Sequence, residues 1–267
     1  MTGIIVAGAA GRMGKRIVDM VNQHPEAAVA GAFERPDHPD AGKDAGRVAG
    51  IGELGVPIAA SLEDAAGTGE VLIDFTVPEA TLENARAASK KGLAVVIGTT
   101  AIAGKMLEEL QEISRGIRCV MAPNMSVGVN VLFKIAGEMA RILGEDFDME
   151  ILETHHRFKK DAPSGTAMRL GQILAGAVGR NWDKVGVFAR KGMIGERTDE
   201  EIGIQTWRAG DIAGEHTVLF GGIGERLELT HRAHSRDNFA KGAVRAALWV
   251  VDRPAGLYDM QDVLGLK

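Results

Sequence analysis

The sequence predicts an α/β protein with two domains, one built on a parallel sheet and the other on a mixed sheet. In the first half, short apolar runs alternate with segments whose apolar residues recur at helical spacing. Strands that alternate with helices are typical of a parallel sheet covered on both faces. After Asn124 the strand-like stretches follow more closely, and glycine-containing turns separate the last three, which favours an antiparallel or mixed sheet.

The first half of the chain supplies the parallel sheet. Apolar runs predict strands over residues 4–7, 29–33, 71–75, 94–97 and 117–121. Apolar residues at helical spacing predict helices over residues 12–22, 79–91 and 105–114. Residues 35–57 are rich in Gly, Asp and Pro, so we expect a long connection there with at most short secondary structure.

The second half supplies an inserted α+β domain. We expect a long helix over residues 127–143 and another from Ser164 to about residue 178. Strands are expected over residues 149–155, 202–208, 215–220 and 226–231. From Ser235 the chain returns to helical spacing, and we expect this tail to pack on the first domain. The predicted boundaries are therefore 1–126 with 236–267 for the first domain, and 127–235 for the insertion.

Composition excludes several classes of protein. The 267 residues carry a formal net charge of −5 and contain no basic stretch interleaved with aromatic residues, so we expect no nucleic acid partner. The first apolar run is too short to span a bilayer and no basic region precedes it, so we expect neither export nor a membrane anchor. The single cysteine, Cys119, excludes an intramolecular disulfide, which fits a cytoplasmic protein.

A glycine turn joins the first strand to the first helix in the segment IIVAGAAGRMGKRI. Gly11 and Gly14 match the last two glycines of the dinucleotide-binding fingerprint, with Ala9 at the position of the first. Glycines let a pyrophosphate approach the backbone, and the helix N-terminus and Arg12 offer it positive charge. A plain strand-to-helix turn is the alternative. Glu34 follows about 20 residues on, at the end of the second strand, and favours a Rossmann-like dinucleotide-binding domain.

Glu34 and Arg35 bear on the choice of cofactor. A carboxylate at Glu34 accepts hydrogen bonds from ribose hydroxyls and favours NADH. A guanidinium at Arg35 can hold a 2′-phosphate or stack on adenine, which favours NADPH or permits both cofactors, unless it is only a solvated loop charge. The sequence thus predicts NADH, NADPH or both.

Two further predicted strands end in small polar residues. The motif GTT (98–100) follows one strand, and the motif APN (122–124) follows the next. Because the carboxyl ends of parallel strands line the ligand crevice of such sheets, these residues can meet the nicotinamide ribose or its carboxamide. Thr100 and Asn124 could instead serve only as helix caps.

The segment ETHHRFKKDAPSGTA, residues 153–167, offers a proton donor beside a binding site for an acidic small molecule. His155 ends a predicted strand and can exchange a proton near neutral pH, and Lys159 adds a positive charge. Ser164 is suited to cap the following helix, whose first-turn amides and hydroxyls suit a carboxylate. His156 with Lys159 could hold a second carboxylate.

The same residues have other interpretations. Two histidines near a lysine often lie in a solvated loop. A zinc site would need a third ligand at metal spacing, so we expect no metal. Ser164 lacks the strand-to-helix elbow of a serine nucleophile and could be only a helix cap. Cys119 lies among apolar residues without a nearby base, which argues for a buried hydrophobic side chain over a catalytic thiol.

The motifs GAAGRMG, GTT and HHRFKKDAPSGTA together resemble the dihydrodipicolinate reductase family, also called 4-hydroxy-tetrahydrodipicolinate reductases. The segments RAGDIAGEHT (208–217) and GLYDMQDVLGL (256–266) are similar to that family too, so the resemblance extends over residues 4–266. It implies a Rossmann-like domain and a mixed-sheet domain that binds substrate and forms a homotetramer. It also implies NADH- or NADPH-dependent reduction of a small dicarboxylate, 4-hydroxy-tetrahydrodipicolinate, in lysine and diaminopimelate biosynthesis.

The resemblance further implies roles for individual residues. His155 would donate or accept a proton, and Lys159 would donate one. We expect the substrate to contact His156, Ser164, Gly165, Thr166 and Thr100. We expect the dinucleotide to contact Gly8, Ala9, Ala10, Gly11, Arg12, Met13, Glu34, Arg35, Gly98, Thr99, Thr100, Ala122, Pro123, Asn124 and Met125. The family commonly has an aromatic residue at position 125, so Met125 keeps an apolar contact but loses ring stacking.

Two other functions are open on sequence alone. Another two-domain dehydrogenase would share the glycine turn without needing the His155 and Lys159 pair. A non-enzymatic NAD(H) sensor would lack proton donors at its cleft. The reductase hypothesis requires that the histidine segment face a bound nicotinamide across a shared cleft.

Overall fold

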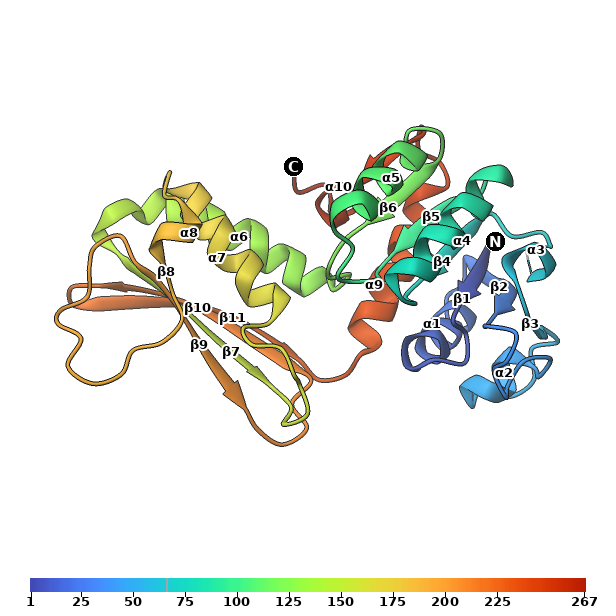
Figure 1. Ribbon diagram of the computed structural model, residues 1–267, viewed down its shortest axis with the longest axis horizontal. Helices are drawn as coiled ribbons and strands as arrows, with labels where there is room; N and C mark the ends of the chain where they lie inside the picture. Colours follow the sequence, from blue (N-terminus) through green and yellow to red (C-terminus); the bar gives the residue numbers. More distant parts are fainter. Residues whose placement is uncertain (66) are drawn as a thin grey trace. The chain divides into compact units, whose positions relative to one another are not determined.

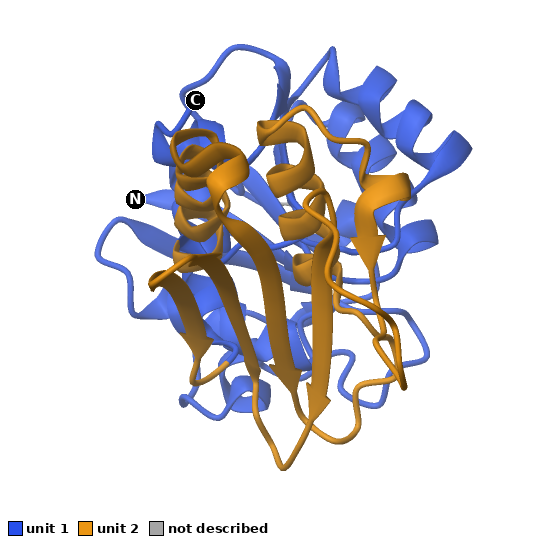
Figure 2. Ribbon diagram, turned by 90° about the vertical axis from the view of Figure 1, so that its left-hand side faces the viewer, with its two compact units in different colours: residues 1–127, 236–267 blue, residues 128–235 orange. Residues whose placement is uncertain are grey.

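The computed structural model describes residues 1–65 and 67–267, which form two compact units. Unit 1 contains residues 1–127 and 236–267, and unit 2 contains residues 128–235 (Figure 2). The chain therefore leaves unit 1 once, builds unit 2, and returns to complete unit 1.

Unit 1 is built on a seven-stranded sheet in which every neighbouring pair of strands is parallel (Figure 1). β-branched runs such as IIV and AVVI form its central strands, as expected for strands buried on both faces. The strands, in order across the sheet, are β12 (Gly256–Tyr258), β6 (Arg118–Met121), β5 (Ala94–Ile97), β4 (Val71–Asp74), β1 (Thr2–Ala7), β2 (Ala27–Phe33) and β3 (Ile58–Ala59).

Helices cover both faces of this sheet, because alternate strand residues point to opposite sides. Ile4 and Val6 of β1 pack with the first group of helices, and Ile5 and Ala7 pack with the second group. The first group contains α1 (Arg12–Asn22), α2 (Ala45–Ala49), α9 (Asp237–Val250) and α10 (Met260–Leu264). The second group contains α3 (Leu62–Ala65), α4 (Pro78–Lys90) and α5 (Gly104–Ser114).

Unit 2 is built on a five-stranded mixed sheet. Strand β10 is antiparallel to both of its neighbours, whereas β7, β9 and β8 run parallel to one another. The strands, in order, are β11 (Glu225–Ala233), β10 (Gly214–Gly222), β7 (Asp148–His155), β9 (Ile202–Arg208) and β8 (Gly186–Val187). The core of unit 2 joins this sheet to three helices, α6 (Val127–Leu143), α7 (Gly165–Ala177) and α8 (Trp182–Val185).

Strand β7 changes character along the face that these helices cover. Met149, Ile151, Glu153 and His155 share that face, since side chains alternate along a strand. The first two are apolar and lie in the core of unit 2, whereas the last two are polar. Helix α7 begins beside them, because the amide of its N-cap residue Ser164 donates to Glu153 Oε1 at 3.0 Å. A polar site therefore forms where the strand ends and the helix begins.

The predicted fold class is confirmed, and the main elements lie within a few residues of their predicted bounds. The predicted connection over 35–57 contains only the five-residue helix α2. The sequence pattern did not predict α3, α8, α10, β3, β8 and β12, which contain two to five residues each. Elements this short rest on tertiary pairing, as in β12, which pairs with β6 through Gly256 and Arg118.

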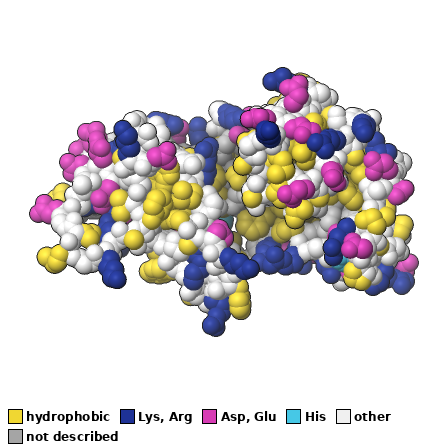
Figure 3. Space-filling model, viewed as in Figure 1, with side chains coloured by type: hydrophobic (Ala, Val, Ile, Leu, Met, Phe, Trp, Pro, Cys, Tyr) yellow, Lys and Arg dark blue, Asp and Glu magenta, His cyan; other side chains and the backbone are white. Residues whose placement is uncertain are grey.

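The surface carries both signs of charge. Lys, Arg, Asp and Glu side chains are interspersed on the face shown in Figure 3, with hydrophobic side chains between them. Within residues 1–65 and 67–267, no helix combines the length and the apolar character needed to cross a bilayer.

Candidate active site

The glycine turn before α1 can receive an anion. Gly11 is the N-cap of α1 and has no side chain with which to cap the first-turn amides, and residues 12–14 of this first turn include no acid. A side chain at Gly14 would collide with the carbonyl oxygen of Gly8, so this position requires glycine. Uncapped amides at a helix N-terminus attract phosphates. This turn therefore fits the pyrophosphate of a dinucleotide.

The turn is joined directly to the end of strand β2. The Ala9 amide donates to the Phe33 carbonyl oxygen at 3.1 Å, which brings Glu34 to the same edge of the sheet as the glycine turn. Glu34 is half-buried, whereas Arg35 is exposed and lies 3.5 Å from Asp37 in an ion pair. Both groups that were predicted to meet the adenosine ribose thus lie next to the turn.

A buried carboxylate organises the ends of strands β4 and β5. Asp74 is fully buried, and its Oδ1 accepts from the hydroxyls of Thr76 (2.7 Å), Thr81 (3.0 Å) and Thr99 (3.3 Å). The side-chain Nδ2 of Asn84 donates to Asp74 Oδ2 at 2.7 Å. These contacts fix the backbone from which Gly98 and Thr100 extend.

The residues predicted to line the nicotinamide differ in how far they reach the surface. Thr100 and Pro123 are exposed, whereas the hydroxyl oxygen of Thr99 lies 2.8 Å from that of Thr81. Asn124 Oδ1 accepts from the Ser126 amide at 2.9 Å, in a turn just before α6. Four of the predicted residues are buried, and one of them, Met125, is 1% exposed within the core that contains α9. The buried set is Gly98, Thr99, Ala122 and Met125.

In unit 2 the side chain of His155 is held by a buried acid. His155 Nδ1 lies 2.5 Å from Oε2 of Glu153, which is fully buried. Arg208 pairs with both oxygens of the same carboxylate, at 2.9 and 3.0 Å. Burial alone would raise the pKa of Glu153, but hydrogen bonds from His155 and Arg208 outweigh it and lower this pKa to about 2. The carboxylate is therefore ionised near neutral pH.

Ser164 links the start of helix α7 to a second histidine. Its Oγ accepts from the Ala167 amide at 3.2 Å, so the predicted cap is present. The same Oγ lies 3.0 Å from Nε2 of His216, whose ring lies edge-on to His155 with a centroid separation of 5.2 Å. Burial, reinforced by the charge of His155, lowers the pKa of His216 to about 3, so His216 is neutral near pH 7.

Lys159 lies in the loop between β7 and α7 and pairs with an acid that the sequence analysis did not assign. Its Nζ lies 2.8 and 2.9 Å from the two carboxylate oxygens of Asp161, and this contact lowers the pKa of Asp161. Arg208 Nη2 donates to the Asp161 backbone oxygen at 2.7 Å, which ties the loop to strand β9. The ammonium group is thereby held near the arginine that also pairs with Glu153.

The remaining predicted substrate residues lie along the same segment. Gly165 is exposed and Thr166 is half-buried, both in the first turn of α7. The ring of His156 lies 6.3 Å from that of Phe158. Within the described part of the chain, Nδ1 of His156 is buried without a hydrogen-bond partner, which is unusual for a buried polar atom.

Besides Asp161, four residues of this site were not predicted from the sequence: Glu153, Thr206, Arg208 and His216. Glu153 lies two residues before His155 on a predicted strand, so period-two alternation already places both on one face. The others come from neighbouring strands, and their closeness depends on the register that pairs Thr206 and His216 with Glu153. An acid on the same strand face as Met149 and Ile151 was the available signal, because a buried charge needs partners.

Two further observations narrow the chemistry of the described residues. Among residues 1–65 and 67–267, no group of three or more His, Cys, Asp and Glu side chains is arranged to hold a metal ion. Cys119 is 3% exposed, and burial raises the pKa of its thiol to about 12, so it is protonated at neutral pH.

Solved structures share the fold. A structure described as dipicolinate-bound dihydrodipicolinate reductase from Paenisporosarcina sp. TG-14 superposes with a TM-score of 0.76 at 24% identity, covering 98% of each chain. A structure described as GenD2 from gentamicin A biosynthesis in complex with NAD gives a TM-score of 0.63 at 14% identity, covering 99% of this chain and 90% of the other.

Sequence comparison resolves the family. A family model described as the N-terminus of dihydrodipicolinate reductase matches residues 2–125, and one described as its C-terminus matches residues 128–264. The 4-hydroxy-tetrahydrodipicolinate reductase of Desulfotalea psychrophila is 57% identical over all of this chain and 99% of its own length. That of Syntrophobacter fumaroxidans is 53% identical over the whole of both chains. The chain therefore belongs to the dihydrodipicolinate reductase family.

Proposed function

We propose that the protein uses NADH or NADPH to reduce 4-hydroxy-tetrahydrodipicolinate to tetrahydrodipicolinate and water, in lysine and diaminopimelate biosynthesis. The observation that carries this proposal is the arrangement around His155. An imidazole backed by an ionised acid, an ammonium group at Lys159 and the start of helix α7 at Gly165 lie on one segment. Together they offer a transferable proton and binding groups for carboxylates.

Each group has a distinct task in this proposal. His155, assisted by Lys159, supplies the proton that the reduced ring takes up. The amides at the start of α7, with Ser164 and Thr166, bind one carboxylate of the substrate. His156 binds the other, and its unpaired Nδ1 supports this assignment. Thr100 of unit 1 is assigned a further substrate contact on family resemblance.

Unit 1 is assigned the dinucleotide. Its uncapped helix start at Gly11 would hold the pyrophosphate, and Glu34 and Arg35 would hold the adenosine ribose. The segments 98–100 and 122–125 would lie along the nicotinamide, and the reduced cofactor, when bound, supplies the hydride. Met13 and the backbone of residues 8–12 complete the phosphate-binding turn.

Assembly and location form the remaining parts of the proposal. Unit 2 would bind substrate and build a homotetramer, as the family resemblance implies. Its sheet carries exposed apolar side chains that an interface would cover, among them Trp207 (60% exposed) and Leu227 (43% exposed). Light scattering of the purified protein tests the oligomeric state. A cytoplasmic location is supported by the single cysteine, which excludes an intramolecular disulfide.

The experiment that tests the activity follows the oxidation of NADH and of NADPH with substrate formed enzymatically from pyruvate and aspartate semialdehyde. We expect turnover, and we expect inhibition by pyridine-2,6-dicarboxylate, which presents two carboxylates on a planar ring. Pyridine-2-carboxylate is the matched control and should inhibit less. Binding of NADH without turnover would favour a sensor, and turnover of a different acid would favour another dehydrogenase.

A further inference from the structure

The acid behind His155 has all of its acceptor positions filled. Oε1 of Glu153 accepts from Arg208 at 2.9 Å, from the Ser164 amide at 3.0 Å and from the Thr206 hydroxyl at 3.1 Å. Oε2 accepts from Arg208 at 3.0 Å and contacts His155 Nδ1 at 2.5 Å. A carboxylate offers about four lone-pair sites, so these five contacts leave it no freedom to turn. The donors come from β7, β9 and the start of α7.

This contact determines which ring nitrogen of His155 carries a hydrogen. An ionised carboxylate only accepts hydrogen bonds, and hydrogen bonds from His155 and Arg208 keep the pKa of Glu153 at about 2 despite its burial. Nδ1 must therefore be the donor in the contact with Oε2. Nε2 is then the nitrogen that gains and loses the exchangeable proton.

The Nε2 edge of the ring borders Gly214, the first residue of β10. A Cβ at this position would lie 3.1 Å from Nε2, and Gly214 has a φ of +155°, which favours glycine. His216 lies on the same strand and is neutral, because burial lowers its pKa to about 3. The charged groups around His155 are thus Glu153 on β7, Arg208 on β9, and Lys159 with Asp161 in the loop that precedes α7.

We propose that Glu153 is a positioning residue for the reduction: its carboxylate holds His155 in the tautomer with hydrogen on Nδ1 and directs Nε2 to the substrate. This inference rests on the proposed proton transfer by His155. Arg208, Thr206 and the Ser164 amide act on the same carboxylate and keep it in place. When His155 is protonated, the adjacent negative charge stabilises the imidazolium; when it is neutral, the hydrogen bond preserves the tautomer.

The test replaces Glu153 by glutamine, which keeps the shape of the side chain and removes its charge. We expect kcat to fall about 10²-fold, in the range for losing effective general acid catalysis. The dissociation constants for NADH and for pyridine-2,6-dicarboxylate should stay near their wild-type values. Nitrogen NMR of labelled histidine should show His155 with hydrogen on Nδ1 in the wild type, and a shift toward the other tautomer in Glu153→Gln.

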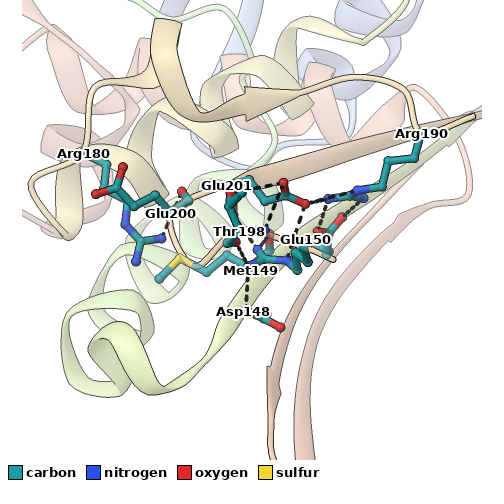
Figure 4. A network of polar contacts seen from close by, with 9 residues as sticks. Asp148, Met149, Glu150, Arg180, Arg190, Thr198, Glu200 and Glu201 are labelled. Atoms are coloured by element: carbon teal, nitrogen blue, oxygen red, sulfur yellow. Dashed lines mark hydrogen bonds and ion pairs between the residues drawn. The ribbon is translucent and has the colours of Figure 1, made fainter. Parts of the chain in front are cut away.

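A matched control lies three residues earlier on the same strand. Glu150 points to the opposite face and pairs with both Nη atoms of Arg190 at 2.7 and 3.0 Å, within the network shown in Figure 4. Its partners among the described residues are Arg190 and Arg197. Glu150→Gln removes the same charge from an arginine pair, so it should lower stability and leave kcat and the His155 tautomer unchanged.

A second variant guards against misfolding of Glu153→Gln. Glu153→Asp keeps a carboxylate on a shorter side chain, so it should retain the wild-type tautomer and lose less activity than the glutamine variant. Wild-type kcat and tautomer in Glu153→Gln would overturn the proposal. If Glu153→Gln lost activity but kept hydrogen on Nδ1 of His155, the proposal would also be overturned, because the lost activity would then come from a structural change and not from the tautomer. An inactive wild type would contradict the proposed function, while the NMR measurement would still report on the tautomer.

Discussion

Among residues 1–65 and 67–267, each unit buries one carboxylate completely, and the two carboxylates differ in what surrounds them. Asp74 in unit 1 contacts hydroxyls, an amide side chain and a backbone amide, all of them neutral. Glu153 in unit 2 contacts an arginine and a histidine. Neutral hydrogen-bond donors around a carboxylate can hold the backbone of a loop in place. When the donor is a histidine, the carboxylate also determines which ring nitrogen carries the hydrogen. The comparison suggests that buried polarity in unit 1 maintains backbone shape and in unit 2 controls a proton.

The largest effect should come from the proton-transfer residues of unit 2. In Lys159→Ala we expect kcat to fall about 10²-fold or more, because a proton donor and a positive charge are lost together. Steady-state kinetics measures the change, with Lys160→Ala, an exposed neighbour, as the control. Near-normal turnover in Lys159→Ala would refute its role.

The second prediction concerns Asp74, the buried carboxylate of unit 1. Asp74→Asn replaces one acceptor oxygen by a donor, so at least one buried hydroxyl or amide loses its partner, at a cost of about 1–3 kcal/mol. We expect a corresponding loss in urea unfolding and weaker NADH binding. Glu83→Gln, at an exposed position of α4, is the control. If NADH binding were unchanged, the buried cluster would not shape the cofactor segment.

The third prediction uses the pH dependence of stability. Burial lowers the pKa of His216 from 6.5 to about 3, so between these values the unfolded chain binds a proton that the folded protein excludes. The free energy of unfolding should therefore fall as the pH drops below 6.5, by up to about 1.4 kcal/mol per pH unit.

The pH dependence of the free energy of unfolding also distinguishes the contribution of His216 from that of Glu153. The lowered pKa of Glu153 also makes stability fall in acid, but only below its ordinary value of 4.5. His216→Asn should therefore reduce the wild-type slope between pH 6.5 and about pH 5, and His231, whose pKa burial also lowers, accounts for part of what is left. His234→Asn, at an exposed histidine, should leave the slope unchanged. A wild-type slope in His216→Asn would show that another group takes up the proton.

The smallest effect is expected at the exposed edge of unit 1. Glu34→Ala should weaken NADH binding several-fold, about the value of one or two exposed hydrogen bonds, with less effect on NADPH. Arg35→Ala should act mainly on NADPH. Titration of both cofactors against both variants measures the difference. Equal losses for the two cofactors would contradict the ribose assignment.

Sequence patterns predicted the longer helices and strands well, because an element that buries one face carries apolar residues at the period of a helix or a strand. The helices over 12–22 and 127–143 begin and end where the spacing of apolar residues predicted. Strand β12 was missed, since three residues carry no period and its place depends on pairing with Arg118 far along the chain. Short elements of this kind follow from the assembled sheet.

The candidate site divides in the same way. His155, Lys159 and Ser164 are close in sequence, so their local pattern predicted a shared site. Arg208 reaches Glu153, and His216 reaches Ser164, only through the register of three strands, which the sequence alone does not specify. The identity of these two residues was visible in the motif RAGDIAGEHT, but their contacts were not.

The late return of the chain to unit 1 affects how the protein folds during synthesis. Strands β1 to β6 leave the ribosome well before α9 and β12. Helix α9 covers one face of the sheet, and β12 pairs with its edge strand β6. Unit 2 is continuous in sequence, so it has all of its strands while the nascent sheet of unit 1 still exposes apolar side chains. The dinucleotide-binding half is thus begun first and completed last, and in the interval it is the part of the nascent chain most exposed to aggregation and to chaperones.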